Sequence, residues 1–137
     1  MQAIDQDTNQ DQLLVKNSVI CGYCNEEIQS LFRHNFNMCS CGKTFVDGGV
    51  LGYYARIGGD NFKDTSVCCN KNDIACIREY VTWGTYGKSG REKLKRVLIK
   101  DLTTEHIEAI LETQLGLSEV LKSIFEMELE YRKGEMK

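Results

Sequence analysis

The residues that decide the fold are VICGYCNEEIQSLFRHNFNMCSCGKTFV, at positions 19–46. They contain two close cysteine pairs, CGYC at 21–24 and CSCG at 39–42. The two-residue spacing of the first pair lets a tight turn aim both sulfurs at one cation, with backbone N–H groups directed toward the thiolates. Asn25 follows the first pair and Gly42 the second, and both residue types tolerate the left-handed backbone that such turns demand. The spacing therefore predicts two turns that face a common metal ion.

Four thiolates are available to that ion, from Cys21, Cys24, Cys39 and Cys41. Zinc suits them, because soft sulfur ligands close a tetrahedron at about 2.3 Å and leave no position open for a substrate. Such a closed site is structural and can contribute on the order of 10 kcal/mol to folding. His34 is a rival for one ligand position, but its distance from both pairs favours a surface or supporting role. We therefore predict a structural Zn²⁺ site.

The other three cysteines, Cys68, Cys69 and Cys76, carry less information. A second metal site would need a further ligand such as His106, so we expect partly buried thiols instead. The total of seven cysteines is odd, and in a reducing compartment metal ligation and free thiols are better accounts than disulfides.

The chain has the composition of a soluble protein. Apolar residues make up 42% of it and charged residues 27%, and no apolar run approaches the roughly 20 residues needed to cross a bilayer. The polar, acidic segment 1–12 lacks the basic region and apolar stretch of a signal peptide. We expect a cytoplasmic location and no membrane partner.

A chain of 137 residues has room for one domain, or for a zinc module with a small helical appendage. Short strands are expected beside the cysteine pairs, at 18–20 and 43–46, and a third at 50–57 after a glycine turn. Residues 58–73 are polar and show no period, so we expect irregular structure there.

The second half of the chain predicts a hairpin and then two helices. β-Formers at 79–83 and an apolar cluster within 93–100 predict a hairpin with a long glycine-rich connection. Thr103 can cap a helix that ends at Gly116, and Ser118 can cap a second one, which together make a helical hairpin.

The predicted fold class is α+β, with an N-terminal four-cysteine zinc ribbon and β-hairpins followed by the C-terminal helical hairpin. Residues 1–12 are expected to be mobile and residues 13–57 to form the ribbon. Residues 58–137 are expected to form the β-hairpin and two helices, packed with the ribbon as one unit. The second helix presents an apolar stripe that suits a homo-oligomer as readily as a core, so the oligomeric state stays open.

Charge is distributed unevenly, with a balance of −3 over residues 1–60, +5 over 61–100 and −5 over 101–137. Cations interleaved with aromatic rings are typical of single-stranded nucleic acid binding. The alternative is a solvated hairpin face that pairs with the acidic helices of the same chain. The candidate binding residues are Trp83, Tyr86, Lys88, Arg91, Lys93, Lys95 and Arg96.

Catalytic signals are weak, and we expect a binding protein rather than an enzyme. Residues 84–89 end like a phosphate-binding loop, but Thr82 occupies the place of that motif's first glycine and the following residues look extended. His106 has no nucleophile or carboxylate partner that the sequence assigns to it. Asp47 lies in a Val-Asp-Gly-Gly turn, which accounts for it without catalysis.

Two stretches resemble small, functionally uncharacterised proteins of tailed bacteriophages. CGYC, RHNFNMCSCG and FVDGG are similar to their zinc-ribbon segment, and TWGTYGKSGREKLKRVLIKDLTTEHIEAILE looks like a second module of such proteins; together they cover about residues 19–113. The resemblance implies a viral protein in the host cytoplasm that inhibits or redirects a host protein or protein–nucleic acid complex, such as a CRISPR or other anti-phage effector. A nucleic-acid-binding ribbon that uses the 88–100 stripe is the alternative.

Overall fold

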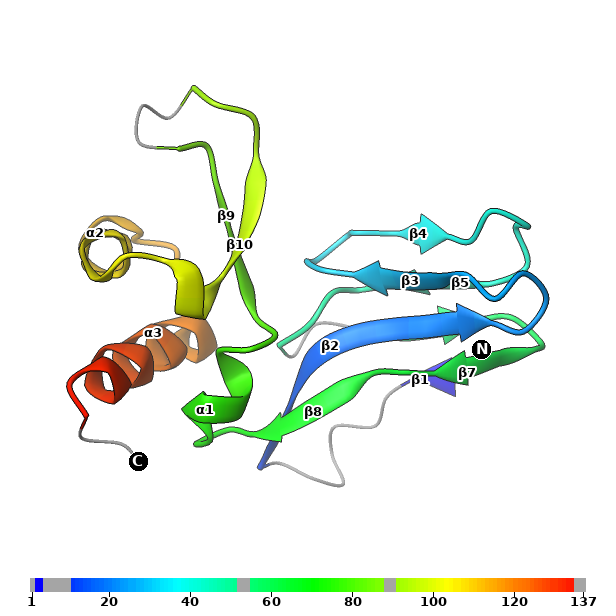
Figure 1. Ribbon diagram of the computed structural model, residues 1–137, viewed down its shortest axis with the longest axis horizontal. Helices are drawn as coiled ribbons and strands as arrows, with labels where there is room; N and C mark the ends of the chain where they lie inside the picture. The colour runs from blue at the N-terminus through cyan, green and yellow to red at the C-terminus, as the bar shows by residue number, and fades with distance from the viewer. Residues whose placement is uncertain (1, 4–10, 52–54, 88–90, 135–137) are drawn as a thin grey trace. The chain divides into compact units, whose positions relative to one another are not determined.

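The computed structural model describes residues 2–3, 11–51, 55–87 and 91–134 (Figure 1). Their structure is mixed α/β, with more strands than helices. The chain divides into two compact units, residues 1–71 and 72–137.

The first unit is organised around the long strand β2 (Gln12–Cys21). Its C-terminal half pairs with β3 and β7, and its N-terminal half pairs with β8, all antiparallel. A second antiparallel sheet has the strand order β1-β6-β5-β4 (Figure 1). The strand bounds are β1 Gln2–Ala3, β3 Glu27–Ser30, β4 Asn37–Met38, β5 Phe45–Asp47, β6 Arg56–Gly58, β7 Phe62–Asp64 and β8 Val67–Asn70.

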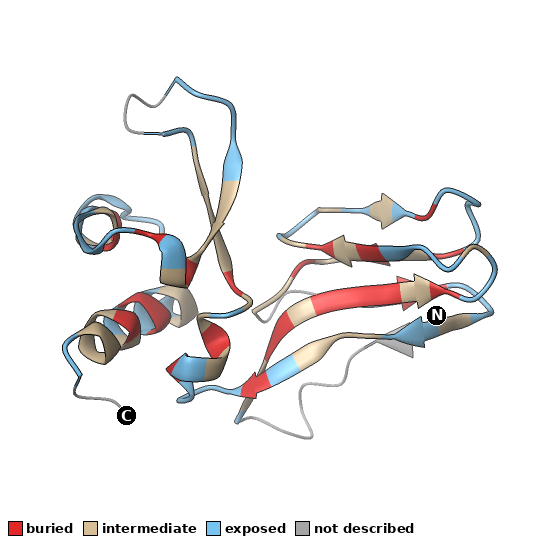
Figure 2. Ribbon diagram, viewed as in Figure 1, coloured by how far each residue is buried: buried red, intermediate tan, exposed pale blue. Residues whose placement is uncertain are grey.

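Buried residues line the middle of β2 on both of its faces (Figure 2). The polar ones are tied by hydrogen bonds, as burial requires. The Asn17 Nδ2 donates to the carbonyl oxygens of Asp47 and Gly49, at 2.9 Å each. These two hydrogen bonds link β2 to the last residue of β5 and to the turn that follows it.

The core of the first unit draws on both sheets and includes cysteines. Cys24 and Phe62 pack against it. The metal-ligand candidates are thus part of the hydrophobic core, whose buried members are Val19, Cys21, Ile28, Cys39, Val46 and Ile57.

In the described residues of the second unit, the chain forms one β-hairpin and four helical segments. The hydroxyl of Thr103 accepts the N–H of His106, and that of Ser118 accepts the N–H of Leu121, so both predicted caps are confirmed. The bounds are α1 Ile74–Ile77, β9 Thr82–Thr85, β10 Lys95–Leu98, the 3₁₀ turn η1 Ile99–Asp101, α2 Thr104–Thr113 and α3 Glu119–Arg132.

A buried carboxylate joins several of these elements. Glu128 on α3 has no exposed surface and lies between two arginines. Arg78 donates to it through two nitrogens at 2.9 and 3.0 Å, and Arg132 donates through Nε at 2.7 Å. Arg132 also reaches the carbonyl of Ile99 and the hydroxyl of Thr104. This ion triad connects α1, η1, α2 and α3.

Several sequence-based boundaries differ from the structure. Of the strand expected at 50–57, Arg56 and Ile57 lie in β6, and residues 52–54 lie outside the described part. Gly49 and Leu51 have positive φ angles of 66° and 64°, so the chain turns there. The segment 58–73, expected to be irregular, contains β7 and β8. Within 79–83 only Thr82 and Trp83 are in a strand, and α2 ends at Thr113 rather than Gly116.

The first unit extends to Lys71 and includes β7 and β8, because both strands pair with β2. Within the segment expected to be mobile, Gln2–Ala3 pairs with β6, while residues 1 and 4–10 lie outside the described part. The packing of ribbon and helices as one unit stays a prediction.

None of the helices in the described residues combines the length and apolar content needed to pass through a lipid bilayer.

Candidate metal centre

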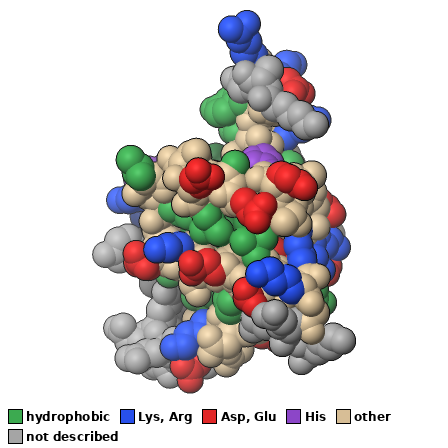
Figure 3. Space-filling view, turned by 90° about the vertical axis from the view of Figure 1, so that its left-hand side faces the viewer, with side chains coloured by type: hydrophobic (Ala, Val, Ile, Leu, Met, Phe, Trp, Pro, Cys, Tyr) green, Lys and Arg blue, Asp and Glu red, His purple; other side chains and the backbone are tan. Residues whose placement is uncertain are grey.

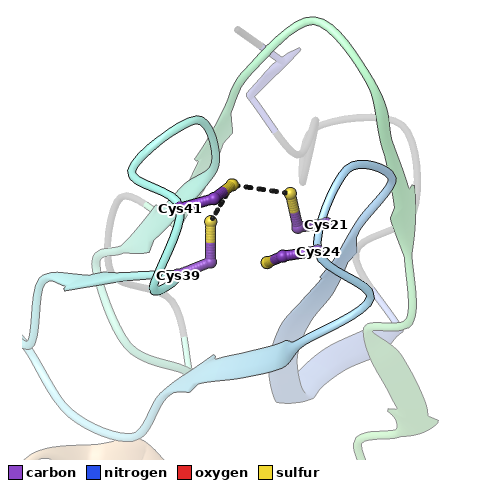
Figure 4. A group of neighbouring side chains, drawn as sticks. All are labelled: Cys21, Cys24, Cys39 and Cys41. Atoms are coloured by element: carbon purple, nitrogen blue, oxygen red, sulfur yellow. Dashed lines mark hydrogen bonds between the residues drawn. The ribbon is translucent and has the colours of Figure 1, made fainter.

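The four predicted ligands come from two turns of the first unit. Cys21 is the last residue of β2 and Cys24 lies in the turn that follows it. Cys39 and Cys41 belong to the loop between β4 and β5, and all four side chains converge (Figure 4). Their sulfur atoms all lie within 4.8 Å of one another.

The sulfur separations fit a single tetrahedral ion. The Sγ atoms of Cys21 and Cys41 are 3.6 Å apart, and those of Cys39 and Cys41 are 3.5 Å apart. Four sulfurs at about 2.3 Å from one ion would be separated by about 3.8 Å along each edge of the tetrahedron. The cluster therefore has a geometry able to hold a metal ion, as the sequence predicted.

The two turns share one hydrogen-bond frame. The N–H of Cys21 donates to the carbonyl of Glu26, and the N–H of Cys39 donates to that of Thr44, both at 3.0 Å. Asn25 and Gly42 have φ angles of 61° and 77°, as their positions predicted. Each turn thus closes on itself and points its sulfurs inward.

Two further hydrogen bonds hold the turns in place. The Glu26 carboxylate accepts the N–H of Ser40 at 2.6 Å and so links one turn to the other. The N–H of Gly22 donates to the carbonyl of Asn61 at 2.8 Å, and a Cβ on Gly22 would lie only 2.2 Å from the Asn61 side chain. A larger residue at position 22 would therefore require the Asn61 side chain to move.

The surroundings shift the thiol pKa values unequally. The nearby Thr44 side chain makes the largest contribution to lowering the pKa of Cys21 to about 6, and backbone N–H groups add to it against the effect of burial. The N–H of Tyr23 donates to this sulfur at 3.4 Å. At Cys41 the backbone N–H of Lys43 lowers the pKa. Desolvation and hydrogen bonds with the neighbouring thiols outweigh this effect and raise the pKa to about 12. The Cys21 thiol therefore loses its proton at a lower pH than the Cys41 thiol.

Burial and charge differ between the inner and outer sides of the cluster. Cys21 and Cys39 are buried, whereas Cys41 is exposed. On the outer side, the Lys43 ammonium lies 4.3 Å from the centre of the Tyr23 ring, and the Tyr23 hydroxyl donates to Asp60. The contact with Asp60 raises the pKa of Tyr23.

The remaining candidate ligands do not join this group in the described part of the chain. His34 has a positive φ of 67° and is exposed, in agreement with a surface role. Cys68 is a free thiol on an exposed residue. Partial desolvation and the negative charge of Asp64 raise its pKa. Cys69 and Cys76 are disulfide-bonded, so the expectation of plain thiols is wrong for them.

Only some of the candidate binding residues predicted at 83–96 are exposed. Trp83 packs edge-on against Phe125 with ring centroids 5.5 Å apart, and Arg96 donates to the hydroxyl and carbonyl oxygens of Thr82. Burial also lowers the pKa of Arg96. Lys88 lies outside the described residues. The exposed members are Tyr86, Arg91, Lys93 and Lys95, and Leu94 is an exposed neighbour that the sequence analysis missed.

Lys and Arg side chains lie at the hairpin end of the face drawn in Figure 3, beside hydrophobic and acidic ones. Side chains of both charges also lie over the rest of that face (Figure 3).

Comparison with known proteins identifies one relationship. A family described as "Domain of unknown function (DUF7695)" matches residues 13–59. The matched range contains all four clustered cysteines and both turns that carry them. No curated protein and no solved structure matches the chain.

Proposed function

We propose that the first unit is a zinc ribbon with a structural Zn²⁺ ion and that the chain works as a binding protein rather than an enzyme. The observation that carries the proposal is the convergence of four cysteine sulfurs within 4.8 Å, from two turns of matching hydrogen-bond frame. Four thiolates are the preferred ligands of structural zinc, and they leave no position on the ion for a substrate.

The placement of the sulfurs in the core supports a structural role. Cys21 ends a strand of one sheet, and Cys39 immediately follows β4 of the other. An ion bound to both would cross-link the two sheets through their shared hydrophobic core. Metal-binding free energy in such sites is folding free energy, so removal of the ion should unfold this unit.

Metal content and unfolding test the proposal together. Purified protein should contain one zinc per chain by elemental analysis, and a chelator should lower its unfolding temperature. Cys39→Ser should abolish both properties, because it removes a buried ligand. Cys68→Ser is the matched control, since it removes a free thiol outside the cluster. A metal-free protein with an unchanged melting curve in Cys39→Ser would end the proposal.

The partner that we propose is a host macromolecule in the cytoplasm of an infected cell. The support for it is the resemblance of residues 19–113 to small phage proteins, together with a site that is closed to substrate. Affinity capture from infected cells with the wild type and with Cys39→Ser tests it, because a specific partner should be lost with the folded ribbon.

Single-stranded nucleic acid is the second candidate, and the exposed hairpin favours it. Tyr86 is 54% exposed near Arg91, Lys93 and Lys95 in sequence. The double variant Lys93→Glu/Lys95→Glu should weaken oligonucleotide binding and reduce its salt dependence, because each lost phosphate contact lowers the slope by about 1. The matched control is the same charge reversal at Lys122 on α3 and at Lys133, the residue that caps the C-terminus of α3. Equal retardation of all three proteins would rule the hairpin out as the binding surface.

A further inference from the structure

Cys41 is the exposed member of the cysteine cluster. Cys21 and Cys39 are 0% and 3% exposed, and Cys24 is half-buried. Oxidation of a cysteine by a small molecule follows its solvent exposure and its thiolate character. Of the four clustered residues, Cys41 is therefore the one that a reagent in solution reaches first.

Two buried sulfurs lie close to the sulfur of Cys41. The Cys39 Sγ lies 3.5 Å away in the same loop, and the Cys21 Sγ lies 3.6 Å away in the other turn (Figure 4). The two sulfurs of a disulfide are about 2.05 Å apart, so either pair would need to approach by only about 1.5 Å. Both neighbours are therefore placed to close a disulfide with Cys41.

The backbone around Cys41 leaves room for this change. Cys41 lies between β4 and β5 and belongs to neither strand. The N–H of Gly42 donates to the carbonyl of Cys39 at 2.9 Å, which closes the turn that contains Cys41. Movement of the Cys41 side chain therefore breaks no hydrogen bond of the sheet.

Bound metal would put all four sulfurs in the reactive state. A thiol that coordinates a divalent cation is deprotonated, so each ligand is a thiolate. The raised pKa of Cys41 belongs to the metal-free cluster and does not keep this sulfur protonated once an ion is bound. The loaded cluster would then present one solvent-exposed thiolate beside two buried ones.

We propose that Cys41 is a modification site for hydroperoxides, at which oxidation ties the exposed sulfur to Cys21 or Cys39 in a disulfide. The inference rests on the proposed function of the cluster as a metal site. Two of the four ligands are lost in the product, so the oxidised protein gives up its ion.

The reaction has two steps, and each is balanced. The Cys41 thiolate attacks the hydroxyl oxygen of the peroxide, the O–O bond breaks, and the leaving oxyanion takes a proton from solvent. This step oxidises the sulfur to a sulfenic acid and reduces the peroxide by two electrons. The neighbouring thiolate then attacks the Cys41 sulfur, the S–S bond forms as the S–O bond breaks, and the hydroxide that leaves is protonated to water.

Disulfide mapping tests the site directly. Zinc-loaded Cys68→Ser protein is used, because this background removes the exposed free thiol outside the cluster. One equivalent of hydrogen peroxide should consume two thiols and release one zinc per chain, measured with a chromogenic chelator. Mass spectrometry of acid-quenched, digested protein should show Cys41 joined to Cys21 or Cys39.

Exchange of a ligand for histidine separates the attacked sulfur from the rest of the cluster. Histidine is an ordinary ligand of structural zinc and forms no disulfide. At equal peroxide concentration, Cys41→His should release zinc about 10-fold more slowly than the parent protein, because the exposed thiolate is gone. Cys24→His is the matched comparison, since it makes the same exchange at a half-buried position, and it should release zinc faster than Cys41→His.

The outcomes distinguish this inference from the proposed function on which it rests. If the protein binds zinc and retains it under peroxide, or forms disulfides of any other connectivity, the role of Cys41 is refuted and the metal site stands. Equal rates of zinc release from the two histidine variants would also refute it. If either variant fails to bind zinc, the disulfide map alone decides. If the reduced Cys68→Ser protein and the wild type bind no metal, both inferences fall.

Discussion

Replacing Glu128 by glutamine should destabilise the second unit more than any surface change of the same kind. The carboxylate has no exposed surface and accepts three charge-assisted hydrogen bonds, from Arg78 at 2.9 and 3.0 Å and from Arg132 at 2.7 Å. In Glu128→Gln the two guanidinium groups keep their charges and face a neutral amide that can accept through only one oxygen. Breaking a buried ion pair in this way typically costs about 3–5 kcal/mol.

The two arginine side chains are 19% and 20% exposed, which sets the lower end of that range as the better expectation. A loss of about 3 kcal/mol is a large part of the roughly 5–15 kcal/mol by which a native domain is stable. At a urea m value of about 1.5 kcal/mol/M, the unfolding midpoint should fall by about 2 M.

Trp83 makes this measurement specific to the second unit. It is the single tryptophan of the chain and packs on Phe125 of α3, so its fluorescence in a urea titration reports this unit. Glu126→Gln is the matched control, because it makes the same change at an exposed position of the same helix. The reasoning is refuted if both variants unfold at the same urea concentration.

Four further outcomes are expected. Gly49→Ala should destabilise the first unit by more than about 1 kcal/mol, because φ is +66° and the new Cβ would lie 2.4 Å from the Phe32 carbonyl carbon. Gly116→Ala is the control, because no atom lies within 4 Å of the new Cβ there, and its unfolding temperature should change little. Melting followed by circular dichroism measures both. Denatured, metal-free protein should show five reactive thiols before reduction and seven after it in a colorimetric assay. The raised pKa of Cys68 lowers its thiolate fraction at neutral pH, so in metal-loaded protein its alkylation, followed by mass spectrometry, should need more alkaline conditions than a free cysteine peptide. Asp64→Asn should shift that pH dependence toward neutrality, because it removes a negative charge beside the thiol.

The parts of the structure that the sequence predicted are those coded by neighbouring residues. The two cysteine turns need only a short spacing and a residue that accepts positive φ, and Asn25 and Gly42 supply it. The helix starts need only a hydroxyl three residues before a free N–H, which Thr103 and Ser118 provide. Such local signals survive whatever the rest of the chain does.

Features that depend on distant partners escaped the sequence analysis. Strands β7 and β8 are short and largely exposed, so they carry no period, and they exist because β2 is long enough to pair with both. Glu128 looks like any solvent-facing helix residue until Arg78, fifty positions away, is brought beside it. The same holds for Trp83, which was expected on a binding surface and instead packs on Phe125.

The exposure of Cys41 has a consequence for how fast the centre could exchange its ion. Its three companions are buried or half-buried, so an incoming competitor can displace only this sulfur without opening the core. We expect the kinetics of metal transfer to an external acceptor to depend on Cys41, while the equilibrium preference depends on all four thiolates. Such a centre can bind its ion with high affinity and still exchange it with an external acceptor through the exposed Cys41.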